Sequence, residues 1–289
     1  MTQPGKIAVL TDSNCDLPQQ YFKKYPIFRL PLVVTCGGKD YRDGIDITVE
    51  EIYRRQPNED FKTSLPMRDD IDATLDAIAR AGYTQVIVLP LAEVLSGTAN
   101  QLRLIAQERT DLDIAVFNTK SASVGVGIQA VQVAQYAAAG MEFEQLKRLT
   151  AQLIEDTTAM FSIDTLEYLR RGGRIGAMAA TVGTMLDLKP IITENREGKL
   201  VSSDKVRGRK AALRLIADKA AENIDDPAQA MTIILHADAP EDAARLETML
   251  RERVPELGEI QTYYVGPVIG AHCGPGTVAI CFFGKERPC

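Results

Sequence analysis

The first half of the chain alternates short apolar runs with segments of helical periodicity. The apolar runs are Ile7–Leu10, Gln85–Leu89 and Ile114–Phe117. Helical patterns at Arg68–Ala81 and Thr98–Arg109 precede the second and the third run. Apolar runs separated by helices are typical of βαβ units, which form parallel sheets. The pattern predicts an α/β fold with a parallel-sheet, Rossmann-like N-terminal domain, whose ligands are expected where loops leave the strand ends.

The stretch Pro31–Tyr53 interrupts this alternation. It contains Gly37-Gly38, which is typical of a hairpin turn, and Thr48 stands where it can start a short helix. We expect this stretch to pack near the junction of two domains.

Two further helical patterns, Ser121–Gly140 and Phe143–Leu153, close the first half of the chain. We expect a linker near Asp156–Ala159, which places the domains at residues 1–158 and 159–289. The second domain is expected to contain a hairpin, two helices and three further strands. These elements are Lys189–Val201, Arg209–Asn223, Met231–His236, Glu241–Val254, Ile260–Val265 and Val278–Phe283. Strands joined by both a hairpin and helices predict an α+β domain with a mixed or mostly antiparallel sheet.

The start of the second domain carries detailed local signals. Asp164 is placed to cap a helix from Thr165 to Arg171, while Glu167 can reach back to it. In Gly172-Gly173-Arg174, Gly172 is expected to end this helix in the left-handed conformation. The same turn is equally compatible with an anion-binding backbone nest. The apolar stretch Ile175–Leu186 predicts a helix that is buried on all sides.

Basic residues follow the expected hairpin, and we expect them near one tip: Lys205, Arg207, Arg209 and Lys210. Together with Arg170, Arg171 and Arg174, these cations form either a docking face for an acidic partner or an ordinary solvated surface.

Composition narrows the class of protein. The chain has 289 residues, of which 45% are hydrophobic and 25% are charged, and its net charge is −6. This length is enough for two domains with large cores, and the acidic balance argues against broad nucleic-acid binding. The five cysteines lack a Cys-x-x-Cys pair, so neither a zinc site nor a disulfide framework is indicated. Without a leader-like start or a run of about 18 apolar residues, a cytoplasmic location is expected.

Short motifs in a fixed order give the chain a family resemblance. They are Thr11-Asp12-Ser13, Thr63-Ser64-Leu65-Pro66, Leu95-Ser96-Gly97-Thr98, Lys120-Ser121-Ala122-Ser123 and Gly270-Ala271-His272-Cys273-Gly274-Pro275-Gly276. With the turn at Gly172, these motifs resemble the DegV family, fatty-acid-binding proteins that serve as the B subunit of bacterial fatty acid kinase. The resemblance implies a long-chain fatty acid, buried in a pocket, as the ligand.

The resemblance assigns the carboxylate of this ligand chiefly to Thr63 and Ser96, which we expect in loops. Ser64, Gly97 and Thr98 are secondary candidates, since glycine permits close approach and the N-terminus of a helix favours an anion. Taken alone, Ser-Gly-Thr after a strand is usually a turn with a helix cap. The family pattern Thr-Ser-Gln-Pro has leucine at position 65 here, which leaves no side-chain hydrogen bond at that position.

Arg207 and His272 match family positions that flank the carboxylate and assist its phosphorylation. Arginine suits a carboxylate or a phosphoryl group, and histidine can donate a hydrogen bond or move a proton. Their alternatives are a solvated arginine and a histidine held by the backbone of a glycine-rich loop. His236, at the end of an apolar strand, is expected to make a local hydrogen bond only. Cys273 is not expected to form a nucleophilic pair with its neighbour His272.

The chain has no phosphate-binding loop, no dinucleotide-binding turn and no metal-ligand spacing. This absence agrees with the resemblance, which implies a separate kinase subunit of the dihydroxyacetone-kinase-related type that supplies ATP and magnesium, and no cofactor or catalytic residue of the chain's own. A lipid ligand is also compatible with transient contact with a membrane. One alternative is a stand-alone serine hydrolase or acyl transferase that uses Ser96, with His272 as its base. Another is a regulator whose basic residues 205–210 touch nucleic acid, which the net charge disfavours.

Overall fold

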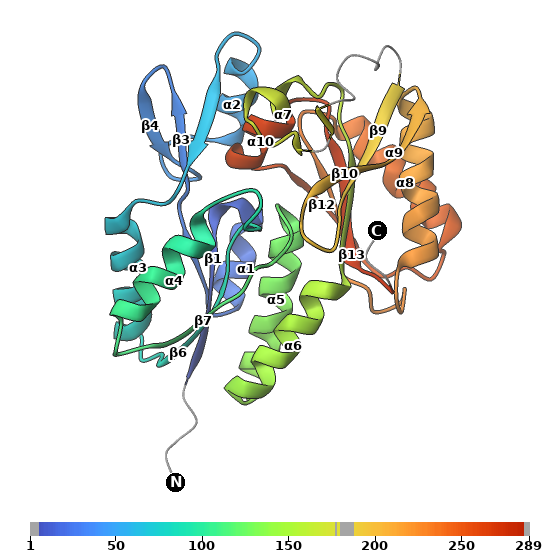
Figure 1. Ribbon diagram of the computed structural model, residues 1–289. Coiled ribbons are helices and arrows are strands. Elements are labelled where there is room, and N and C mark those ends of the chain that lie inside the picture. Colours follow the sequence, from blue (N-terminus) through green and yellow to red (C-terminus); the bar gives the residue numbers. More distant parts are fainter. Residues whose placement is uncertain (1–5, 177, 180–187, 286–289) are drawn as a thin grey trace.

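A parallel sheet organises the first half of the molecule (Figure 1). The computed structural model describes residues 6–176, 178–179 and 188–285. Its first sheet has the order β2-β1-β6-β7, and all neighbouring strands run parallel. The strands are β1 (Ile7–Asp12), β2 (Ile27–Leu30), β6 (Gln85–Leu89) and β7 (Asp113–Val116). The predicted Rossmann-like α/β domain is confirmed.

Helices cover both faces of this sheet, which explains why its strands are apolar almost throughout. On one face, Ala8 and Leu10 pack against Ile71 and Leu102. The helices on that side are α3 (Arg68–Arg80) and α4 (Thr98–Glu108). On the other face lie α1 (Gln19–Lys24), α5 (Val124–Ala138) and α6 (Phe143–Asp156). A short 3-10 turn, η1 (Ser13–Cys15), follows β1.

The part of the chain between β2 and α3 forms a small antiparallel sheet, with the order β4-β3-β5. Its strands are β3 (Val33–Cys36), β4 (Lys39–Arg42) and β5 (Phe61–Ser64). Gly37 and Gly38 both have positive φ, as a two-residue hairpin turn requires, and Thr48 caps α2 (Val49–Arg55) by accepting from the Glu51 N–H. Both predictions are confirmed. The Tyr53 hydroxyl donates to the Val265 carbonyl at 2.8 Å, so this insertion packs against the second half of the chain.

The C-terminal sheet has the order β10-β9-β8-β13-β11-β12. Only the β11–β12 pair in this sheet is parallel, so the predicted mixed, mostly antiparallel sheet is confirmed. Its strands are β8 (Thr157–Ser162), β9 (Leu188–Glu194), β10 (Leu200–Arg207), β11 (Thr232–His236), β12 (Ile260–Tyr264) and β13 (Val278–Phe283). The helices of this half are α7 (Glu167–Arg171), α8 (Arg209–Asn223), α9 (Pro240–Arg253) and α10 (Pro267–Cys273).

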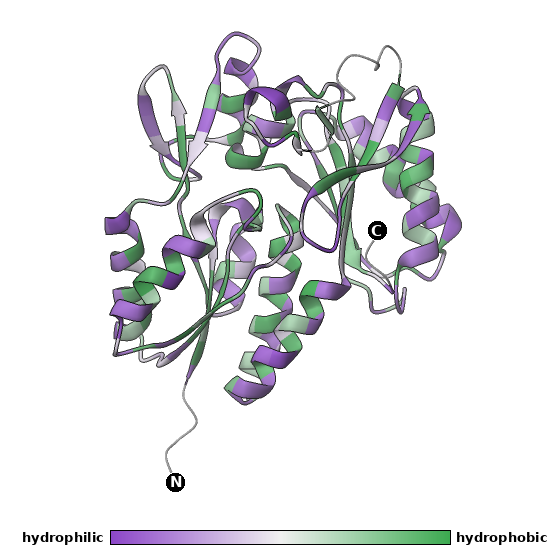
Figure 2. Ribbon diagram, viewed as in Figure 1, coloured by the Kyte–Doolittle hydropathy of each residue, from purple (hydrophilic) through white to green (hydrophobic). Residues whose placement is uncertain are grey.

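The two faces of this sheet have different neighbours. Helices α8 and α9 cover the outer face, with Leu213 and Leu246 packed against Ile280. On the inner face, Leu235 packs with α5 and α10, which brings the C-terminal sheet against the first half of the chain. Figure 2 shows the consequence, with hydrophobic strands inside and hydrophilic stripes on the outward sides of the helices.

Several local predictions need correction. Thr165, and not Asp164, accepts the hydrogen bond from the Glu167 N–H at the start of α7. Gly173 has the left-handed φ of +71°, whereas φ of Gly172 is −73°. The expected linker is absent from the described chain, because β8 begins at the residue after α6 ends. Most of the helix predicted at Ile175–Leu186 lies outside the described residues.

Candidate functional site

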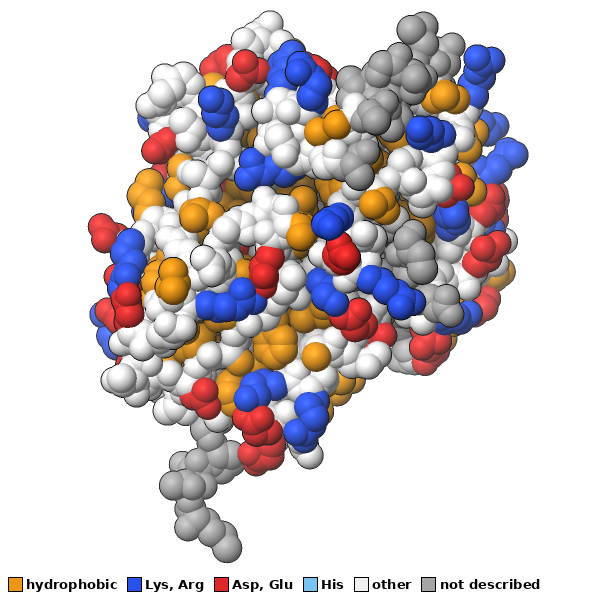
Figure 3. Space-filling model, in the orientation of Figure 1, with side chains coloured by type: hydrophobic (Ala, Val, Ile, Leu, Met, Phe, Trp, Pro, Cys, Tyr) orange, Lys and Arg blue, Asp and Glu red, His pale blue; other side chains and the backbone are white. Residues whose placement is uncertain are grey.

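A cavity of about 330 Å³ lies between the C-terminal sheet and the first half of the molecule. This volume is within the range of sites for small molecules. Its walls come from β5, the loop after β6, the start of α5, α10 and several strands of the C-terminal sheet. Hydrophobic side chains show in the hollow between the two halves in Figure 3, with basic side chains beside it. The cavity therefore requires both halves of the chain.

Small side chains on two neighbouring strands make room for this cavity. Ala279 on β13 pairs with Phe161 and Leu235, and Cys281 pairs with Ala159. All five residues line the cavity. Because alternate residues of a strand share one face, Ala279 and Cys281 leave a continuous apolar strip along β13. An extended apolar molecule fits such a strip.

Polar side chains gather at one part of the cavity wall. Thr63 on β5 and His272 in the last turn of α10 meet there, with Thr63 Oγ1 2.7 Å from His272 Nε2. The sequence predicted a loop for each residue, and both predictions are wrong. Strand β5 is held by pairing with β3, where Thr63 faces Val34, and α10 packs against the small sheet and α7. Regular elements fix this pair more rigidly than loops would.

The environment of His272 favours its neutral form. Burial, reinforced by the positive charge of Arg174, lowers the pKa of His272 to about 4. Its buried Nδ1 atom has no hydrogen-bond partner among the described residues. We therefore assign the proton to Nε2, because a buried acceptor without a partner costs less than a buried N–H without one. In this tautomer Nε2–H donates to Thr63, which directs the Thr63 hydroxyl hydrogen elsewhere.

Gly172 allows this arrangement at the end of α7. A Cβ atom at Gly172 would lie 2.0 Å from His272 Nδ1. Since φ of Gly172 is −73°, the backbone itself would accept another residue. Glycine is therefore required here for space and not for conformation.

Ser96 lies in the loop before α4, and Ser96 and Gly97 both line the cavity. Ser96 Oγ is 2.9 Å from Thr98 Oγ1 and accepts from the Thr98 N–H at 3.3 Å. Ser96 thus accepts from the first N–H of α4, whose N-cap residue is Gly97, while also lining the cavity. Thr98 begins α4 as predicted and is buried, but it is not among the lining residues. Ser64 and Leu65 line the outer part of the wall and are exposed.

Arg174 is a lining residue that the sequence did not single out. Its Nε donates to the Leu95 carbonyl at 3.2 Å, and its Nη1 donates to the Gly172 carbonyl at 2.7 Å. These two bonds fix the guanidinium plane beside the loop that carries Ser96. Of the two alternatives left open for these cations, neither fits Arg174, which lines the cavity, whereas Arg170 and Arg171 are exposed and pair with Glu167.

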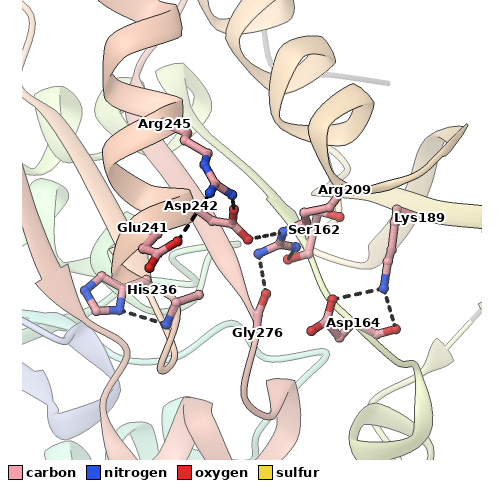
Figure 4. Close-up of polar contacts among 10 residues, drawn as sticks. Ser162, Asp164, Lys189, Arg209, His236, Glu241, Asp242, Arg245 and Gly276 are labelled. Atoms are coloured by element: carbon pink, nitrogen blue, oxygen red, sulfur yellow. Dashed lines mark hydrogen bonds and ion pairs between the residues drawn. The ribbon is translucent and has the colours of Figure 1, made fainter.

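The other basic residues do not form one tip. The β9–β10 turn lies at 195–198, whereas Arg207 pairs with Leu188 at the opposite end of this hairpin. Arg207 is exposed and is not among the residues that line the cavity. Arg209 points inward, where its Nε bonds Asp242 at 2.7 Å and its other nitrogens reach the Ser162 and Gly276 carbonyls (Figure 4). Arg209 is therefore structural, and the predicted basic tip is wrong.

Two further residues behave as the sequence predicted. His236 is buried, and its Nδ1 accepts from the Ala239 N–H at 3.4 Å (Figure 4). Its burial also lowers its pKa. Cys273 lines the cavity, but burial raises the pKa of its thiol to about 12, so a thiolate nucleophile is not available.

Glu194 is a second lining residue that the sequence analysis missed. It is 4% exposed, and it accepts from Ser121 Oγ at 2.7 Å and from the Ala122 N–H at 2.8 Å. These bonds fasten β9 to the segment that precedes α5. Within the described ranges, no group of His, Cys, Asp and Glu side chains is placed to hold a metal ion. Among the helices that the structure describes, none combines the length and the apolar character that a membrane span requires.

Comparison with known proteins identifies the family. The family model described as uncharacterised protein, DegV family, matches residues 6–285. A DegV domain-containing protein of Clostridium perfringens is 36% identical over 275 residues, which cover 95% of this chain and 97% of that protein.

Solved structures agree with this assignment. A DegV family protein from Thermus thermophilus, described as fatty-acid-binding, has 31% identity and a TM-score of 0.87, with 96% of this chain and 99% of that chain covered. A fatty-acid-binding DegV family protein from Streptococcus agalactiae has 28% identity and a TM-score of 0.89, with 98% and 100% covered. The chain belongs to the DegV family.

Proposed function

We propose that this protein binds one long-chain fatty acid in the cavity between its two halves. The observation that carries the proposal is an apolar cavity whose polar wall holds the Thr63–His272 pair, together with Ser96 and Arg174. The T. thermophilus and S. agalactiae relatives, which are described as fatty-acid-binding, support the same ligand class.

The apolar strip accounts for the tail. Burial of one methylene contributes roughly 0.8 kcal/mol, so a tail of about 15 methylenes gains on the order of 12 kcal/mol before ordering costs. The head group is the harder part, because a carboxylate that leaves water must find donors or a cation.

The polar wall provides both. Because His272 Nε2–H donates to Thr63, the Thr63 hydroxyl donates its own hydrogen to the carboxylate. The Ser96 hydroxyl supplies a second donor from the facing loop. Arg174 supplies the positive charge, and its guanidinium plane is already held by main-chain carbonyls. Gly97 lets its loop approach the head group closely, while Ser64 and Thr98 belong to the segments next to Thr63 and Ser96.

The finer part of the proposal concerns the fate of this carboxylate. We infer that a separate kinase subunit of the dihydroxyacetone-kinase-related type phosphorylates it to an acyl-phosphate in the cytoplasm, since the chain shows no nucleotide-binding motif. Arg174 is placed to balance negative charge at the head group, and His272 orients it through Thr63. Arg207, which is exposed outside the cavity, would act at the contact with the kinase.

Ligand identity is tested by extracting purified protein and analysing the extract by mass spectrometry, followed by titration of delipidated protein with palmitic acid. We expect a fatty acid in the extract and saturable binding. Absence of both would refute the proposal.

The kinase step is tested separately with a kinase subunit, ATP and magnesium, trapping the acyl-phosphate with hydroxylamine. Hydrolysis of acyl esters by the protein alone, lost in Ser96→Ala, would instead support the stand-alone enzyme.

A further inference from the structure

Asp16 lies where distant segments of the chain meet. It follows η1 with a left-handed φ of 49°, and its carboxylate Oδ2 accepts a hydrogen bond from Ser123 Oγ at the start of α5. The same carboxylate interacts with the backbone N–H of Gly266, which precedes α10. One side chain thus connects the first strand-end turn with two helices that border the cavity.

The close fit at Gly266 shows that this contact is specific. A Cβ atom there would lie 2.3 Å from Asp16 Oδ1, although φ of Gly266 is −68°, a value that any residue adopts. Glycine is required at this position because the carboxylate occupies the space.

Ser123 has an unusual backbone conformation, with φ of 56° and ψ of −141°. Non-glycine residues rarely adopt this region, and they do so only when surrounding contacts impose it. The contacts here are the Asp16 carboxylate and Asn14 Oδ1, which accepts from the Ser123 N–H at 3.0 Å. Ser123, Val124 and Gly125 all line the cavity, so these contacts set the position of its wall.

Helix α10 is held at its start in a related way. Its first N–H groups lack partners within the helix, and side-chain oxygens can accept hydrogen bonds from them. The carboxylate of Asp16 meets Gly266, and that of the buried Asp43 interacts with the Val268 N–H and Ser13. The last turn of α10 carries His272, so the start of this helix determines where the polar wall lies.

We propose that Asp16 is a positioning residue of the ligand site, which holds Ser123 in its strained conformation and anchors α10. This inference rests on the proposed binding of a fatty acid. Burial raises the pKa of Asp16 well above its usual range, which means that a neutral amide can replace the carboxyl group.

The test compares Asp16→Ala, Asp16→Asn and the double variant Asp16→Ala/Ser123→Gly, with Asp69→Asn as a control at an exposed carboxylate. Delipidated proteins are titrated with palmitic acid, and amide hydrogen exchange is followed in α10. We expect Asp16→Ala to weaken binding by about tenfold or more and to speed exchange in α10. Asp16→Asn should retain binding. The added Ser123→Gly substitution should recover part of the affinity that Asp16→Ala loses, because glycine adopts this conformation without strain.

Wild-type affinity and exchange in folded Asp16→Ala would overturn the inference, and so would equal losses in the Ala and Asn variants or no recovery with Ser123→Gly. If Asp16→Ala does not fold, Gly266→Ala decides the matter, because it displaces the carboxylate without backbone strain and should show the same defects. Wild-type affinity for palmitic acid and wild-type exchange in α10 in Gly266→Ala would overturn the inference. A wild-type protein that binds no palmitic acid would refute the proposed function, whereas the exchange in α10 still tests the role of Asp16.

Discussion

Replacing Thr63 with valine separates two roles that its hydroxyl performs. Valine keeps the branched shape and suits strand β5, so the main change is the loss of one oxygen. In the free protein, Thr63 Oγ1 is the partner of His272 Nε2 at 2.7 Å. In the proposed complex, the Thr63 hydroxyl also donates its hydrogen to the carboxylate of the ligand.

These two hydrogen bonds affect different measurements. The bond to the carboxylate exists only in the complex, and a hydrogen bond to a charged group contributes about 1.5–3 kcal/mol. Its loss should raise Kd by about 10-fold to 100-fold. The bond to His272 exists with and without ligand, so its loss should lower the free energy of unfolding of the free protein by about 1–3 kcal/mol.

Both quantities are measured on delipidated protein, Kd by titration with palmitic acid and unfolding by urea denaturation. Thr63→Ser is the matched control, because it keeps the hydroxyl and should stay near wild type in both. Unchanged affinity in Thr63→Val would refute the assignment of the carboxylate to Thr63. An equally weak Thr63→Ser variant would show that packing, and not the hydroxyl, determines affinity.

Further predictions concern the surroundings of this pair. Gly172→Ala should weaken palmitic acid binding, because its Cβ would lie 2.0 Å from His272 Nδ1; normal affinity by titration would contradict this packing. The pKa of His272 is lowered to about 4, so the unfolded state takes up a proton first as the pH falls below about 6.5. The stability of wild type relative to His272→Asn should therefore drop by on the order of 2 kcal/mol between pH 7 and pH 4.5 in denaturant titrations; a rise would reverse the assigned shift. Arg174→Ala should reduce both the affinity for palmitic acid, measured by titration, and acyl-phosphate formation, measured by hydroxylamine trapping with a kinase subunit. Arg207→Ala should reduce only acyl-phosphate formation. Equal effects on binding would place both arginines at the cavity.

Elements with strong periodicity or a clear cap were predictable from the sequence. The helix Arg209–Asn223 and the strand Val278–Phe283 have the predicted bounds, and Thr48 caps α2 as expected. Strand β5 and helix α10 were not predicted. The first is short and half polar, and the second contains glycine and begins with proline, so neither is stable alone. Tertiary contacts stabilise both, and both carry residues of the polar wall.

The site residues divide in a similar way. Thr63, Ser96 and His272 were found through their short motifs, and the structure places all three on one cavity. Arg174 was not distinguished from surface arginines, because its orientation depends on the Leu95 carbonyl, far away in the sequence. Asp16 could not be linked to α10 for the same reason. Motifs therefore indicate which residues line the cavity, but the residues that position them emerge only from the fold.

The balance of charge in the polar wall follows from where these residues lie. A protonated His272 beside Arg174 would place two positive charges in a partly dehydrated space, so the imidazole stays neutral. It then acts as a directional N–H donor that orders the Thr63 hydroxyl. Arg174 is the remaining positive charge at this wall, and two of its N–H groups donate to main-chain carbonyls. A carboxylate held in this way meets neutral donors and one oriented cation. In the proposed complex, the carboxylate of the ligand is therefore bound in its ionised form. The proposed phosphorylation needs this form, because a carboxylate that accepts a phosphoryl group must keep its negative charge.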